Sequence, residues 1–341
     1  MSDPVPSDCT RRRLTLQQYV DGVLSGDRVV LARAITLVES DLDSDQELAA
    51  ELLDACLPHT GKSRRIGVAG APGAGKSTFL DALGMHLITD RNERVAILSI
   101  DPSSPVSGGS ILGDKTRMQR LAAQPQAFIR PSASRGRLGG VAPRTRECIL
   151  LVEAAGFQNV LIETVGVGQS ETALRTMTDF FLLLLIPGAG DELQGIKRGI
   201  LEMADLVAIN KADGDNRARA LQAQRSYEFG LRLLGAPLNG WSPRVLTCSA
   251  LTGENIPLIW DVVLEHEAQM TASGFRLARR RQQALDWLWA RLQEQLEAEF
   301  RRHAAVQAAM PAVEQKVREG VWSPPHAARH LLQLFQGPES A

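Results

Sequence analysis

The chain contains 341 residues, in which 38 lysines and arginines nearly balance 39 aspartates and glutamates. This length exceeds the usual size of a single domain, so we expect one large core domain with helical extensions. The balanced charge argues against a global electrostatic attraction to nucleic acid or to an anionic membrane, so we expect neither as a partner.

Cysteine usage and hydrophobic runs indicate the compartment. The cysteines, at positions 9, 56, 148 and 248, form no C-x-x-C pair, and no His-rich tract suggests a metal-delivery site. We therefore expect a cytoplasmic protein with reduced thiols. The arginines at 11–13 precede no apolar segment, so no secretory signal is predicted. The longest aliphatic run, 180–186, is too short to cross a bilayer and predicts a buried strand.

Residues 14–57 carry apolar side chains at helical spacing, with breaks at Gly26 and around 41–44. This pattern predicts an N-terminal helical arm over residues 1–60. Residues 58–63 are interpreted as a linker to the first strand.

An apolar run at 65–69 leads directly into a glycine-rich loop and a helix. Such a loop predicts a phosphate-binding cradle, because its N–H groups can converge on an anion and the following helix adds its dipole. Lys76 would reach the β- and γ-phosphates, and Ser77 would ligate Mg²⁺. A chance match is common for loose glycine patterns but not for eight positions in this context. We expect nucleotide contacts from Gly70, Ala71, Pro72, Gly73, Ala74, Gly75, Lys76, Ser77 and Thr78.

Short Val/Ile/Leu-rich runs then alternate with amphipathic helical patterns to about residue 265. Because the runs are continuously apolar, both faces of each strand should be covered, which predicts an α/β fold with a doubly wound, mainly parallel sheet. This nucleotide-binding domain is expected over residues 61–265, with ligands beyond the carboxyl ends of its strands. The predicted strands are 65–70, 95–100, 127–130, 160–164, 180–186, 205–209 and 244–248.

Two carboxylates follow predicted strands on the phosphate side. Asp101 ends the run at 95–100, and Glu163 ends the run at 160–162. Mg²⁺ prefers oxygen ligands, so both residues are candidate ligands. A single acidic residue at a strand end is more often a helix N-cap, but two that converge on one loop favour the metal interpretation.

The segment Glu163-Thr164-Val165-Gly166 resembles the Asp-x-x-Gly switch of regulatory GTPases, in which the glycine N–H contacts the γ-phosphate. Val167 stands where Ras-like GTPases have a glutamine that orients water. We therefore expect either slow intrinsic hydrolysis or a catalytic group from Gln169, Glu171, Asp114 or another protein.

The segment Asn210-Lys211-Ala212-Asp213 follows the strand predicted at 205–209 and favours guanine. Asp213 can accept hydrogen bonds from N1–H and the 2-amino group of guanine, whereas adenine offers neither donor there. Lys211 would lie across the purine, and Asn210 would connect this loop to the phosphate loop. Alone, such a segment could be an ordinary helix cap. The combination with the phosphate loop and a second base-contacting segment, Ser249, Ala250 and Leu251, predicts GTP and GDP as ligands.

After residue 275 the pattern becomes one long helix with an apolar stripe. Its residues either pack on the chain's own core or form a homodimer interface, and the sequence favours neither. We expect a C-terminal helical region over 266–341, and its role in dimerisation is implied only by the family resemblance below. The stripe comprises Leu285, Trp289, Leu292, Leu296 and Phe300.

Four further segments together resemble one family. They are Asp101–Pro105, Gly109–Met118, Glu163–Glu171 and Gly190–Lys197. The chain is similar, from about residue 25 onward, to the MeaB-type P-loop GTPases, also labelled ArgK or LAO/AO transport kinases. This resemblance implies a homodimeric GTPase chaperone that gates adenosylcobalamin loading and protects or reactivates an acyl-CoA mutase, typically methylmalonyl-CoA mutase.

The resemblance also implies roles for individual residues. Ser77, Asp101, Asp114 and Glu163 would surround Mg²⁺, and Lys76, Asp114, Glu163 and Gln169 would act in hydrolysis. Segments 101–118, 163–171 and 188–197 would be nucleotide-sensitive switches, and arginines at 130–146 would form either a solvated loop or a mutase contact. The alternative function is an ATP- or GTP-dependent kinase of lysine/arginine/ornithine transport, which Asp213 disfavours. A nickel-insertion GTPase would need a Cys/His segment that is not visible.

Overall fold

The computed structural model describes residues 13–101, 118–133, 144–164, 170–188, 198–233 and 240–337. The chain forms two compact units, Met1–Leu277 and Ala278–Ala341. The first unit contains two hydrophobic clusters and the second contains one. The division at residues 60 and 265 stays a prediction.

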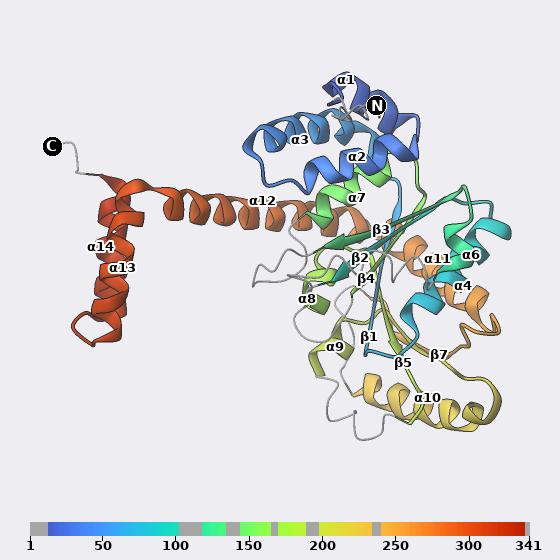
Figure 1. The fold of residues 1–341 in the computed structure, drawn as a ribbon. Helices are drawn as coiled ribbons and strands as arrows, with labels where there is room; N and C mark the ends of the chain where they lie inside the picture. The colour runs from blue at the N-terminus through green and yellow to red at the C-terminus, as the bar shows by residue number, and fades with distance from the viewer. Residues whose placement is uncertain are drawn as a thin grey trace, which may run out of the picture. The chain divides into compact units, whose positions relative to one another are not determined.

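The first unit is built on a seven-stranded sheet in which every pairing is parallel. The strand order is β3-β2-β4-β1-β5-β6-β7, so β1 lies at the centre between β4 and β5 (Figure 1). This arrangement confirms the predicted doubly wound parallel sheet. The strands are β1 Arg64–Gly70, β2 Val95–Asp101, β3 Ala127–Ala133, β4 Asn159–Thr164, β5 Phe180–Leu185, β6 Leu206–Ile209 and β7 Arg244–Thr247.

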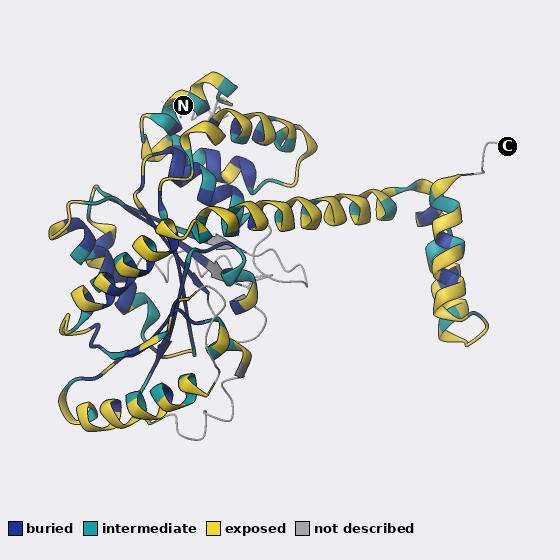
Figure 2. Ribbon diagram, turned by 180° about the vertical axis from the view of Figure 1, so that it is seen from behind, coloured by how far each residue is buried: buried dark blue, intermediate teal, exposed yellow. Residues whose placement is uncertain are grey.

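Helices cover both faces of the sheet, so most residues of the central strands are buried (Figure 2). In β1, Ile66 and Val68 belong to one hydrophobic cluster, whereas Ala69 belongs to the other. Continuously apolar strands are what a sheet covered on both faces requires. The first cluster includes α4 (Lys76–Thr89), α6 (Gln119–Ala122) and α11 (Ile256–Ala272). The second includes α7 (Thr145–Ala154), α8 (Ser170–Arg175), α9 (Arg198–Met203) and α10 (Arg217–Arg232).

The N-terminal arm consists of α1 (Leu16–Leu24), α2 (Arg28–Val38) and α3 (Asp43–Cys56), with breaks where Gly26 and residues 41–44 predicted them. These helices join the second cluster rather than projecting from the domain. Asp27 caps α2 by accepting a hydrogen bond from the N–H of Val29 at 2.7 Å. Arg130 of β3 donates to Glu39 and so connects the end of α2 to the sheet.

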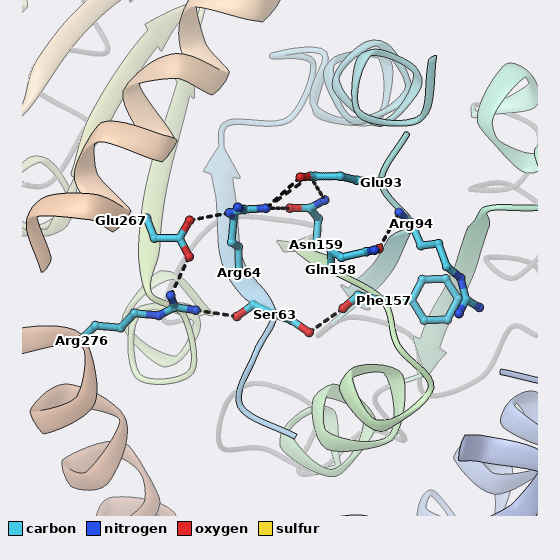
Figure 3. A network of polar contacts seen from close by, with 9 residues as sticks. All are labelled: Ser63, Arg64, Glu93, Arg94, Phe157, Gln158, Asn159, Glu267 and Arg276. Atoms are coloured by element: carbon cyan, nitrogen blue, oxygen red, sulfur yellow. Dashed lines mark hydrogen bonds and ion pairs between the residues drawn. The ribbon is translucent and has the colours of Figure 1, made fainter. Parts of the chain in front are cut away.

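A polar network fixes the amino ends of the central strands (Figure 3). Arg276, in the first turn of α12 (Phe275–Arg302), donates to Glu267 of α11 at 2.6 Å and to the Ser63 carbonyl at 2.9 Å. Glu267 also accepts from Nε of Arg64 at 2.5 Å, and Arg64 reaches Asn159 of β4 at 3.3 Å. The beginning of α12 is therefore attached to β1 and α11 by charge-assisted hydrogen bonds.

Replacing Arg276 with alanine is expected to destabilise the first unit by about 2 kcal/mol, because Glu267 and the Ser63 carbonyl each lose a charged donor. The shift in the urea denaturation midpoint of the full chain would measure this loss. Arg281→Ala, which removes an exposed arginine on the same helix, is the control and should leave the midpoint unchanged. Equal midpoints for both variants would contradict the assignment of this attachment.

The second unit contains the remainder of α12, α13 (Ala304–Arg318) and α14 (Pro324–Gln336). Val306, Val313 and Leu331 form the cluster between α13 and α14, and Phe300 packs against it. His303 has extended backbone dihedrals at the N-cap of α13, which ends the long helix there. In the single chain, the other predicted stripe residues are exposed: Leu285, Trp289, Leu292 and Leu296. No helix within the described ranges combines the length and apolarity needed to cross a membrane.

Candidate functional site

The strand order places the predicted motifs along the carboxyl edge of one sheet. Asp101 ends β2, Glu163 lies near the end of β4, and the glycine-rich loop follows β1. On the other side of β1, Asn210 directly follows β6 and Cys248 directly follows β7. The strands that end near Asp101 and Glu163 therefore lie on one side of β1, and the strands that lead into the predicted guanine-binding segments lie on the other.

The glycine-rich loop is packed so closely that side chains would not fit at two positions. A Cβ atom on Gly70 would lie 2.3 Å from the carbonyl oxygen of Leu184 in β5. Gly75 has a φ of 88° and is the N-cap of α4, and a Cβ atom there would lie 2.7 Å from Nδ2 of Asn210. Glycine is therefore required for both backbone conformation and close approach. Because Gly75 has no side chain, no side chain caps α4 at that position, which suits an anion.

Lys76 begins α4 and folds back over the loop. Its ammonium donates to the carbonyl oxygens of Gly70 at 2.7 Å and Ala71 at 3.2 Å. Burial lowers the pKa of the Lys76 ammonium below its ordinary value, and the charges of Glu163 and Glu171 oppose that shift. The lysine is thus a partly buried cation at the mouth of a loop lined by backbone groups.

Asn210 connects three loops through one side chain. Its Nδ2 donates to the carbonyl oxygen of Ala74 at 2.9 Å, which is the predicted link to the phosphate loop. Its Oδ1 accepts from the N–H of Ala250 at 3.0 Å. Cys248 packs beside the same oxygen, with 3.7 Å between Sγ and Oδ1, and burial raises the pKa of this thiol to about 12. The thiol is therefore protonated and serves as packing.

Asp213 and Ser249 meet beside this link. The Ser249 hydroxyl donates a hydrogen bond to Asp213 and accepts one from the N–H of Thr252 at 3.2 Å. Lys211 is exposed and has a φ of 59°, and its Cε lies 4.0 Å from where a Cβ of Gly75 would stand. The lysine stem therefore borders the phosphate loop, while Leu251 of the same site is 79% exposed.

On the other side of the phosphate loop, Glu163 is buried and accepts a hydrogen bond from Ser99 of β2 at 3.0 Å. Strand register places Ser99 opposite Glu163 and residue 100 opposite Thr164, so the ends of β2 and β4 are adjacent. The Thr164 hydroxyl is buried and makes no hydrogen bond within the described ranges. Hydroxyl and carboxylate oxygens are thus concentrated where Mg²⁺ was predicted, and the residues present fit that ion.

Several predicted residues lie outside the described ranges. These are Asp114, Gln169 and most of the three predicted switches, namely 102–117, 165–169 and 189–197. In the arginine-rich segment, Arg130 pairs with Glu39, Arg144 lies 3.7 Å from Glu147, and Arg146 donates to Thr176 at 2.8 Å. These three arginines therefore make contacts within the chain.

Sequence reasoning missed two features of the site. Ser99 carries no motif, and only the pairing of β2 with β4 brings it to Glu163. Glu171 was considered only as one of several possible catalytic groups, yet it is 5% exposed and its charge acts on Lys76. Its position within the 163–171 motif was the available signal.

Comparisons with known proteins agree with this geometry. Residues 31–305 match the family "Methylmalonyl Co-A mutase-associated GTPase MeaB". A putative GTPase of Caulobacter vibrioides is 52% identical over 92% of this chain and 95% of its own length. The mitochondrial methylmalonic aciduria type A homolog of Mus musculus is 46% identical over 94% of this chain and 80% of its own length.

A solved structure described as an LAO/AO transport system kinase has a TM-score of 0.74 and 39% identity, covering 96% of this chain and 99% of that one. This similarity extends over the whole α/β architecture described above. The matching family and the Caulobacter relative are described as GTPases, and the chain carries the phosphate loop and the predicted guanine segment at one edge of the sheet. The chain therefore belongs to the MeaB family and is a P-loop GTPase.

Proposed function

We propose that this GTPase is a chaperone of an adenosylcobalamin-dependent acyl-CoA mutase, which it loads with cofactor and protects or reactivates. The observation that carries the proposal is the match of residues 31–305 to a family described as mutase-associated. The mouse relative, named for methylmalonic aciduria, supports methylmalonyl-CoA mutase or a close relative as the partner. The nucleotide would act as the timer of this exchange, with GTP and GDP marking its two states.

Within this proposal each side of the site has its own task. Lys76 and the loop from Gly70 to Thr78 would bind the phosphates, and Asp213, Lys211 and Ser249 to Leu251 would bind the base. Ser77, Asp101, Asp114 and Glu163 would hold Mg²⁺, which supplies charge neutralisation between the β- and γ-phosphates. Lys76, Asp114, Glu163 and Gln169 would act in hydrolysis. Because Val167 replaces a water-orienting glutamine, intrinsic turnover should be slow.

We also propose that the chain is a homodimer through α12. Leu285, Trp289, Leu292 and Leu296 are from 40% to 67% exposed in the single chain. Their three- and four-residue spacing puts them on one face of α12, and an apolar helix face of this kind is stable when a second helix covers it.

The experiment is a cofactor-transfer assay with purified apo-methylmalonyl-CoA mutase from the same organism. Adenosylcobalamin absorbance would be followed with this protein and GTP, GDP or no nucleotide. We expect GTP to change the transfer rate and GDP not to do so, and the Lys76→Ala variant to behave as if GTP were absent. A transfer rate that is the same with GTP, with GDP and without nucleotide, while the mutase is bound, would refute the chaperone proposal.

A transport-linked kinase is the second candidate, because the solved relative is described as an LAO/AO transport system kinase. Asp213 beside Ser249 argues against ATP as its phosphate donor, since adenine cannot donate to that carboxylate. ATP turnover far above GTP turnover by the purified chain would favour the kinase over the chaperone.

A further inference from the structure

Strand β2 carries a polar residue directly after an apolar, buried run. Ser99 follows the apolar residues at 95–98 and is only 1% exposed. A hydroxyl in such a place costs free energy unless it makes a hydrogen bond. The Ser99 hydroxyl donates to Oε1 of Glu163 in β4, over a distance of 3.0 Å. A buried serine of one strand is therefore tied to a candidate Mg²⁺ ligand of the next.

Strand register explains why these two side chains meet. Ser99 lies opposite Glu163 in the parallel pairing of β2 with β4, and Val68 of β1 lies opposite Glu163 on the other side. Side chains two residues apart along a strand share one face of the sheet. Ile97, Leu161 and Val68 all belong to the hydrophobic cluster that includes α4. Ser99 and Glu163 lie two residues beyond members of this cluster, so both are on the face that α4 covers.

The position of Glu163 along β4 brings it to the amino end of α4. Its partner in β1 is Val68, and β1 ends two residues later at Gly70, where the glycine-rich loop begins. That loop leads into α4 at Lys76. Burial lowers the pKa of the Lys76 ammonium, and the charge of Glu163 opposes this shift, which agrees with the placement. The carboxylate is therefore buried below the start of α4, where Ser77 is expected to bind Mg²⁺.

The hydrogen bond from Ser99 restricts the orientation of this carboxylate. A carboxylate group is planar, so holding Oε1 of Glu163 also fixes the direction of Oε2. Both residues are 1% exposed, so bulk water does not compete for the hydrogen bond. Metal ions are bound more tightly when groups outside the ligand set hold the ligands in place. Ser99 is in the position of such a group.

We propose that Ser99 is a positioning residue of the Mg²⁺ site, which acts by orienting the Glu163 carboxylate. Its hydroxyl is used by Glu163, so Ser99 itself would touch neither the ion nor the nucleotide. Loss of the hydroxyl should weaken binding of the metal ion and leave the metal-independent affinity for nucleotide unchanged. The inference rests on the proposed role of Glu163 as a metal ligand and is independent of the mutase partner.

The test is a titration of Mn²⁺, a paramagnetic substitute for Mg²⁺, into the full chain with stoichiometric β,γ-imido-GTP. Electron paramagnetic resonance of the free ion measures the affinity. We expect Ser99→Ala to bind Mn²⁺ about tenfold more weakly than the wild type, as is usual when the group behind a metal ligand is lost. Its affinity for the same nucleotide in EDTA should equal that of the wild type.

Three further variants serve as controls. Ser99→Thr keeps the hydroxyl and should bind Mn²⁺ as the wild type does. Ser99→Cys has a weaker donor and should show a smaller loss than the alanine variant. Ser63→Ala removes a similarly buried serine that precedes β1, at the other end of the sheet, and donates to the Phe157 carbonyl at 2.5 Å. This variant should leave Mn²⁺ binding unchanged.

A double-mutant cycle shows whether Ser99 acts through Glu163. Glu163→Gln should weaken Mn²⁺ binding, and adding Ser99→Ala to it should cause no further loss. Equal losses from Ser99→Ala in both backgrounds, or no loss in the wild-type background, would overturn the inference while the metal site stands. If the alanine variant does not fold, the same outcomes apply to Ser99→Cys. Unchanged Mn²⁺ binding by Glu163→Gln would contradict the role of Glu163 as a metal ligand, and with it the inference.

Discussion

Replacing Lys76 with alanine is expected to lower the affinity for GTP and GDP by about a thousandfold, which corresponds to about 4 kcal/mol. The ammonium is the only side-chain cation of the glycine-rich loop, and its hydrogen bonds now go to the carbonyls of Gly70 and Ala71. With phosphates bound, the ammonium would instead donate to anionic oxygens, so that both partners of each hydrogen bond are charged. Fluorescence titration with an N-methylanthraniloyl nucleotide would measure the loss.

Lys76→Arg is the control that keeps the charge and should retain more affinity than the alanine variant. The far-ultraviolet circular dichroism of both should match the wild type, because the residue binds the ligand rather than the core. Affinity of Lys76→Ala within tenfold of the wild type would show that the glycine-rich loop does not bind the β- and γ-phosphates.

Replacing Asp213 with asparagine is expected to invert the base preference from guanine to xanthine. GTP affinity should fall by about a hundredfold or more, because a carboxamide nitrogen would meet the donors at N1 and C2 of guanine. The Ser249 hydroxyl donates to Asp213, so in the variant it would draw the oxygen of the carboxamide toward itself. The amide nitrogen is then left to face the base, where xanthine carries a carbonyl. Competition of GDP and XDP for the same fluorescent nucleotide would measure the preference.

Ser249→Ala combined with Asp213→Asn provides the control. Without the hydroxyl, either orientation of the carboxamide is possible, so the gain for XDP should be smaller than in the single variant. An undiminished preference for GDP in Asp213→Asn would rule out this carboxylate as the group that reads the base.

The strands and the glycine-rich loop were predictable because their signals are local. Each predicted strand lies within a few residues of an observed one. A short, continuously apolar run that is bounded by turn residues is typical of a buried strand. The link from Asn210 to the phosphate loop was predictable as well, because both segments follow parallel strands and must meet at one edge.

Other features depend on tertiary contacts that no short pattern encodes. The apolar stripe predicted the long helix α12, which ends at Arg302, but no pattern in the sequence indicated that α13 and α14 pack on each other as a hairpin. Arg276 contacts both Glu267 and Ser63, and Ser63 lies more than two hundred residues away from it in the sequence. Glu171 is buried in the first turn of α8, and no local pattern distinguishes it from an exposed glutamate at the start of a helix.

The single amide of Asn210 between the Ala74 carbonyl and the Ala250 N–H has an energetic consequence for the ligand. In the proposed site a nucleotide would be a bivalent ligand, because its base and its phosphates would occupy two subsites whose spacing the amide sets in advance. Capture of the base raises the effective concentration of the tail at its own subsite, as with two epitopes on one rigid linker. Without this amide, the two loops would become ordered only when the nucleotide binds. The entropy lost in that ordering would lower the affinity for the nucleotide, even with every direct contact retained.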